Sequence, residues 1–154
     1  MKHTCETVIQ APFNTIFLAA ADVARWPEYL SHYRYNRFLQ HSPSGGVLKT
    51  SWTRTGLSIN GISEYHIDTM NHQLHFHHTH SSFGALAGMK VTWDFTHNFE
   101  GDVAVSITHV LKKRVPVLGA AAEWLLIKAL LDDNATRTLA GLKRKVEMQL
   151  LIQN

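Results

Sequence analysis

The C-terminal third of the chain carries a one-sided pattern of apolar positions. Between about residues 120 and 152 there is no proline and one glycine, and apolar side chains recur at steps of three and four: Trp124, Ile127, Leu131, Ala135, Leu139, Leu142, Val146 and Leu150. The opposite face is charged, through Lys128, Asp133, Arg137, Lys143, Arg144 and Glu147. This spacing predicts a long amphipathic helix that lies on another layer of structure.

The hundred residues before this helix read as strands joined by turns. β-branched and aromatic residues gather in seven runs, at residues 3–10, 33–40, 47–55, 58–68, 74–80, 89–97 and 102–111. Two short helices are predicted after the first run, one beginning at Pro12 and one at Trp26. Because the connections are short, neighbouring strands should pair antiparallel. We predict a single α+β domain, residues 1–154, with a curved antiparallel sheet of about seven strands wrapped on the C-terminal helix.

The length of the C-terminal helix raises a question of continuity. About thirty residues of helix would run some 45–50 Å, whereas strands of about eight to ten residues reach roughly 30 Å. Asp132, Asp133 and Asn134 have the weakest helix propensity in the stretch. We predict a bend or break there, with residues 119–131 near the mouth of a cavity and residues 135–151 gripped by the sheet.

The two-residue period of the strands assigns one face of each strand to the helix. That face mixes aliphatic, aromatic and polar side chains, so it predicts either a partly polar cavity for an apolar ligand or a plain core with satisfied polar groups. In the first case, the candidate ligand-binding residues are Tyr65, Trp93, Phe95, Ile107 and His109 from the strands, and Trp124, Ile127, Leu131, Ala135 and Leu139 from the helix.

Composition limits the partners and the compartment. The net charge of +3 is not gathered into a long basic run, which argues against nucleic acid. Cys5 is the only cysteine and no secretory signal precedes the first strand, so we expect a cytoplasmic protein. No phosphate loop or dinucleotide fingerprint is present, and no cofactor is expected. The pattern leaves the oligomeric state open.

A basic and apolar segment joins the last strand to the long helix. Residues 112–118 run from two lysines and an arginine into Val-Pro-Val-Leu. Such a patch can dock on an anionic membrane surface, where each basic residue contributes about 1 kcal/mol. The alternative is a solvated strand end followed by an apolar loop.

The first third of the chain resembles a known family. An Ala-Pro pair at residues 11–12 is followed by Asp-Val at 22–23, Trp-Pro at 26–27 and Tyr-Leu at 29–30. This order resembles the START-related, Bet v 1-like (SRPBCC) superfamily, particularly its polyketide cyclase/dehydrase and coenzyme Q-binding (COQ10-like) branches. The later part, with Gly88, Val91, Trp93 and Phe95 before a turn, a strand and a long helix, is similar too. The resemblance implies a helix-grip fold with a hydrophobic cavity, in a superfamily of carriers and enzymes that handle lipids, quinones or polyketides.

Four histidines lie close together between residues 75 and 80. On a strand, His75 and His77 share one face and could chelate a metal if Glu64 or His66 supplied a third ligand. No established metal-binding motif supports this. Exposed histidines without a metal are the alternative, and we predict no metal site.

Three side chains are candidates for catalysis. His78 shares its strand face with Phe76, and a His78–Tyr65 pair could move protons on an enolisable ketone, since imidazole titrates near neutral pH. The alternative is a buried, hydrogen-bonded histidine with no chemistry. Arg54 lies in the hairpin where, by resemblance, cyclases carry polar cavity residues. We therefore predict binding or transport of a hydrophobic small molecule, with a polyketide cyclase/dehydrase as the alternative.

Overall fold

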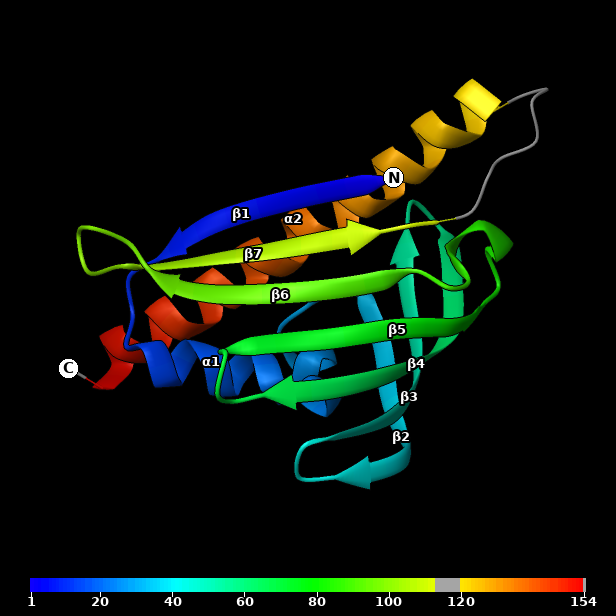
Figure 1. The fold of residues 1–154 in the computed structure, drawn as a ribbon. Coiled ribbons are helices and arrows are strands. Elements are labelled where there is room, and N and C mark those ends of the chain that lie inside the picture. The colour runs from blue at the N-terminus through cyan, green and yellow to red at the C-terminus, as the bar shows by residue number, and fades with distance from the viewer. Residues whose placement is uncertain (113–119, 154) are drawn as a thin grey trace.

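The structure, a computed structural model, describes residues 1–112 and 120–153. In chain order the elements are β1 (Lys2–Ile9), α1 (Phe13–Ala21), the 3₁₀ helix η1 (Val23–Glu28), β2 (Tyr33–Ser42), β3 (Gly45–Arg54), β4 (Leu57–Asp68), β5 (Gln73–Ser81), the 3₁₀ helix η2 (Gly84–Leu86), β6 (Lys90–His97), β7 (Val103–Val110) and α2 (Ala120–Gln153). The strands form one seven-stranded antiparallel sheet in the order β1-β7-β6-β5-β4-β3-β2. The sheet is curved, and α2 crosses its face beside α1 (Figure 1). The predicted α+β architecture is confirmed.

The alternation of side chains along the strands sets which face meets α2. In β7 the residues at every second position are buried, and in β6 the same holds for Val91, Trp93 and Phe95. Thr55 and Gly56 both have positive φ, 45° and 81°, which is the backbone of a tight two-residue hairpin turn between β3 and β4. The buried faces of β6 and β7 are therefore the inner faces predicted from the sequence.

The predicted break in the C-terminal helix is wrong, because α2 is one continuous helix of 34 residues. Its excess length is accommodated by overhang: its first turns run past the strands (Figure 1), and Ala121, Leu125 and Leu126 are exposed there. A straight helix of 34 residues is roughly 50 Å long. Because its first turns extend past the sheet, α2 does not need to bend.

Tertiary and local partners also stabilise the stretch of weak helix propensity. Asp133 pairs with Arg137 one turn later at 3.1 Å. Asn134 is buried and lies 3.5 Å from the Tyr33 hydroxyl. Asp132 contacts His3 on β1 at 3.4 Å. These contacts occupy polar side chains that would otherwise compete for the helix backbone.

The segment between β1 and β2 closes one end of the sheet against α2. The second short helix, η1, begins at Val23 rather than at the predicted Trp26. It places Trp26 in the core, where its indole N–H donates to the Ala20 carbonyl at 3.0 Å. Nearby, a Cβ at Gly141 would meet Leu30 Cδ2 at 2.5 Å, which explains the single glycine of α2 as a close-approach point.

The predicted membrane-contact segment, residues 112–118, lies outside the described residues except for Lys112, which is exposed. Among the described residues, no helix combines the length and the apolar character that a membrane span requires.

Candidate functional site

A cavity lies between the inner face of the sheet and the middle of α2. Its empty space amounts to about 740 Å³ when the open mouth is counted, and the centre of a water-sized sphere can occupy about 60 Å³ of it. Side chains from η1, η2, α2 and all strands except β1 line it. Asn60 and His80 are exposed lining residues, which places the mouth at this end of β4 and β5.

Stacked aromatic rings form one wall of the cavity. The rings of Trp26 and Trp93 are 5.2 Å apart and inclined by 22°. Phe76 packs against both, at 5.6 Å from Trp26 and 6.4 Å from Trp93. Trp52 and Leu131 extend the apolar lining. Such a wall offers flat apolar surface to a ligand ring.

A second part of the lining is polar and internally bonded. Thr50 donates its hydroxyl to Asn36 Oδ1 at 2.6 Å, and Asn36 Nδ2 donates to the Val23 carbonyl at 2.8 Å. Asn134 and the Tyr33 hydroxyl are 3.5 Å apart, at the limit of a hydrogen bond. Burial raises the pKa of Tyr33 to about 12, so its hydroxyl stays protonated. Asn36 and Thr50 hold β2, β3 and η1 together, whereas Tyr33 and Asn134 are more loosely engaged.

Two buried polar atoms of the lining have no hydrogen-bond partner in the described structure. They are Ser63 Oγ and His109 Nδ1. Because a polar atom buried without a partner is costly, water or a ligand is expected to satisfy each of them. These atoms are the polar groups of the cavity most available to a ligand.

His78 also lines the cavity, directly opposite Ser63 in the β4–β5 ladder. Burial, and secondarily His77, lowers the pKa of His78 to about 4. Burial, followed by His78 and His3, lowers the pKa of His109 to about 3. Both imidazoles are therefore neutral at pH 7, and each offers one donor and one acceptor. At neutral pH His78 is therefore held as a weaker base than an ordinary imidazole.

The structure separates the predicted site residues into two groups. Five line the cavity: His78, Trp93, Ile107, His109 and Leu131. The others do not line it: Arg54, Tyr65, Phe95, Trp124, Ile127, Ala135 and Leu139.

Each residue of the second group has another setting. Tyr65 is buried between Phe38 and Phe76. Arg54 ends β3 and is half-buried. Phe95 packs on Phe17 of α1, and Trp124 is 40% exposed within the first two turns of α2. The remaining three residues of α2 are buried in the hydrophobic core: Ile127, Ala135 and Leu139.

Sequence reasoning missed much of the polar lining. Asn36, Thr50 and Asn134 were not among the candidates, although all three are buried. Asn36 and Thr50 occupy inward positions of runs predicted as strands, and polar residues at such positions are a usable signal.

The outer face of β4 and β5 carries three further histidines, His66, His75 and His77. His66 and His75 have ring centroids 6.4 Å apart, and His77 Nδ1 lies 3.9 Å from Glu64 Oε2. They line an open groove on the side of the sheet away from α2. Their ligand atoms do not form a compact group of three among the described residues.

Solved structures resemble this chain over nearly its whole length. The protein TTHA0849 from Thermus thermophilus has a TM-score of 0.81 at 19% identity, covering 97% of this chain and 99% of that one. The Zhui aromatase/cyclase from Streptomyces sp. R1128 has a TM-score of 0.85 at 12% identity, covering 97% and 95%. A START superfamily protein from Mycobacterium smegmatis has a TM-score of 0.76 at 14% identity, covering 96% and 98%.

The chain has the START/Bet v 1-like helix-grip fold. At these identities the likeness establishes the fold alone. No protein-family model matches the chain, and no curated protein matches its sequence. In this helix-grip fold the cavity between the sheet and α2 is the candidate functional site.

Proposed function

We propose that the protein binds a hydrophobic small molecule with an aromatic ring and at least one polar substituent. The observation that carries this proposal is a cavity with a stacked aromatic wall beside two unpartnered polar atoms, Ser63 Oγ and His109 Nδ1. Apolar pockets with a few placed polar groups are typical of small-molecule sites. A ring on the Trp26–Trp93 wall would bring its substituent within the same lining.

The size of the enclosed space limits what the cavity holds. The volume open to the centre of a water-sized sphere is about 60 Å³. A volume of this size holds roughly four or five water molecules. We therefore expect the ligand to place a ring-sized part inside and the rest in the open mouth. Carriage or storage of such a ligand requires no catalytic group, which fits the low pKa of His78.

Filling the cavity should remove binding without unfolding the protein. Ser63→Leu adds apolar volume at a buried lining position and removes the unpartnered hydroxyl. We expect the affinity for 1-anilinonaphthalene-8-sulfonate, a dye that fluoresces in apolar sites, to fall by roughly tenfold or more, or about 1.4 kcal/mol. Energy transfer from the cavity tryptophans to the dye measures the binding.

The neighbouring Glu64 supplies the control, since it lies on the outer face of the same strand and is exposed. Glu64→Gln should leave the dye affinity unchanged. If Ser63→Leu binds the dye as well as wild type, with melting curves showing both proteins folded, the proposed site is wrong.

A second candidate function is cyclisation or dehydration of a polyketide-like substrate. It is supported by His78 beside the unpartnered Ser63 hydroxyl in one cavity, and by the likeness to an aromatase/cyclase of known structure. If the protein turns over such a substrate, His78→Gln should lower kcat by roughly 100-fold, the lower end for a positioned acid or base. An unchanged kcat in that variant would remove His78 from the chemistry.

A further inference from the structure

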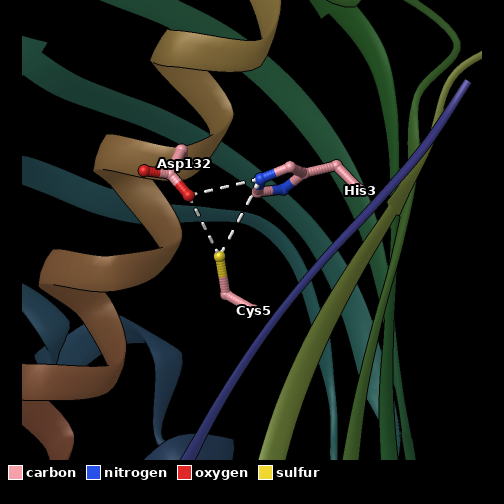
Figure 2. Close-up of side chains that lie close together, drawn as sticks. All are labelled: His3, Cys5 and Asp132. Atoms are coloured by element: carbon pink, nitrogen blue, oxygen red, sulfur yellow. Dashed lines mark hydrogen bonds and ion pairs between the residues drawn. The ribbon is translucent and has the colours of Figure 1, made fainter.

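Beside the cavity, β1 and α2 bring three metal-ligating side chains together. His3 and Cys5 extend from β1 toward Asp132 on α2 (Figure 2). Their ligand atoms lie within 4.8 Å of one another, and they are the one such group among the residues that the structure describes. We propose that His3, Cys5 and Asp132 bind a divalent transition-metal ion of the zinc or cobalt type. This site is separate from ligand binding in the cavity and does not rest on it.

The distances between the three ligand atoms match a tetrahedral site. His3 Nε2 lies 3.4 Å from Asp132 Oδ1. Cys5 Sγ lies 3.6 Å from the same oxygen and 3.9 Å from His3 Nε2. With bonds of about 2.0–2.2 Å to nitrogen and oxygen and about 2.3 Å to sulfur, a tetrahedral ion separates nitrogen from oxygen by about 3.4 Å and sulfur from either by about 3.6 Å. Two separations already match, and the third needs only a slight closure.

The chemistry of the three ligands selects the class of ion. A thiolate, an imidazole and a carboxylate together carry two negative charges, which balance a divalent cation. Sulfur and nitrogen ligands favour zinc, cobalt and their neighbours, whereas magnesium and calcium prefer oxygen alone. The spacing of His3 and Cys5 along β1 puts both on the face toward α2.

The surroundings of the cluster leave one side open. The His3 side chain is 10% exposed and the Asp132 side chain 62% exposed, so the cluster runs from the interior to solvent. Three protein ligands leave a fourth position for water or a small ligand. His3 Nδ1 is buried without a hydrogen-bond partner in the described structure, and so is Nδ1 of His109, whose ring lies 5.8 Å away. The two rings are neighbours without a hydrogen bond between them.

Cobalt(II) titration of the full chain tests the site, after chelator treatment and in a reductant that does not bind metal. We expect one cobalt ion per chain, with the visible bands of tetrahedral cobalt and a thiolate-to-cobalt charge-transfer band. Cys5→Ser should lose the charge-transfer band. Both Cys5→Ser and Asp132→Asn should bind more than about 100-fold more weakly, because losing a ligand costs more than the 10–100-fold lost with an outer-shell partner.

His77→Gln is the matched control, since it removes a histidine from the outer groove. Its cobalt binding should equal that of wild type. Asp132 is largely exposed, so Asp132→Asn is expected to stay folded. This variant therefore tests the site even if Cys5→Ser disturbs β1. The proposal is overturned if no charge-transfer band appears, if Cys5→Ser and Asp132→Asn bind cobalt as wild type does, or if His77→Gln abolishes binding. In those cases the contact between His3 and Asp132 has only a structural role, in packing β1 against α2.

Discussion

Trp26→Ala is expected to lower the free energy of unfolding by about 3–5 kcal/mol, the range for removing a large buried aromatic side chain. Trp26 is 4% exposed and stacks on Trp93 at 5.2 Å, with Tyr33 and Phe76 also in ring contact. The change also leaves the Ala20 carbonyl without the indole N–H. Urea unfolding followed by circular dichroism measures the loss.

Trp124 provides a matched control because it is the same residue type in a different setting. It is 40% exposed and lies within the first two turns of α2. Trp124→Ala should change the free energy of unfolding by less than about 0.5 kcal/mol. Equal losses in the two variants would contradict the placement of Trp26 in the core and of Trp124 outside it.

Stability should also fall as the pH is lowered from neutral toward 4, in part through His32. This side chain is 1% exposed, and its Nε2 lies 2.9 Å from Thr138 Oγ1. Burial, and then the Arg137 charge, lowers the pKa of His32 from 6.5 to about 4, against an opposing effect of Asp133. Between these two values the unfolded chain binds more protons than the folded one. The stability that neutral His32 contributes is therefore present above pH 6.5 and is lost as the pH falls through 4. It amounts to roughly 3 kcal/mol of the free energy of unfolding.

His32→Gln isolates this contribution, since the other buried histidines stay in place. The free energy of unfolding, measured in urea at pH 7.5 and at pH 4, should fall by roughly 3 kcal/mol less in the variant than in wild type. The pH dependence is the readout, so a uniform loss of stability in the variant does not affect it. Equally steep profiles for the two proteins would show that His32 is not held neutral in the fold.

Patterning of single strands and helices was enough to predict most of this fold. Alternation in β6 and β7 placed Trp93, Ile107 and His109 on the inner face, and all three line the cavity. Such patterns are local, since each strand has one face toward the core. The continuity of α2 was only partly local. Besides the Asp133–Arg137 pair within the helix, it depends on Tyr33 beside Asn134 and on His3 of β1 beside Asp132.

The position of the cavity along α2 could not be read from the helical stripe. The stripe marks the face toward the sheet, but packing on β1 and α1 fills most of that face. Only Leu131 and Asn134 of the described α2 residues line the cavity. Similarly, the two-residue spacing of His3 and Cys5 in the sequence places both on one face of β1. Their proximity to Asp132 depends on the path of α2 across the sheet, which the spacing does not predict.

Native mass spectrometry of the freshly purified protein tests most directly whether the cavity between the sheet and α2 binds a hydrophobic small molecule. We expect an added mass on the wild-type chain, either from a co-purified molecule or after exposure to aromatic ligands with polar substituents. The added mass should persist in Glu64→Gln and disappear in Ser63→Leu. A wild-type chain that takes up no such molecule, or an added mass that survives in folded Ser63→Leu, would contradict ligand binding in this cavity.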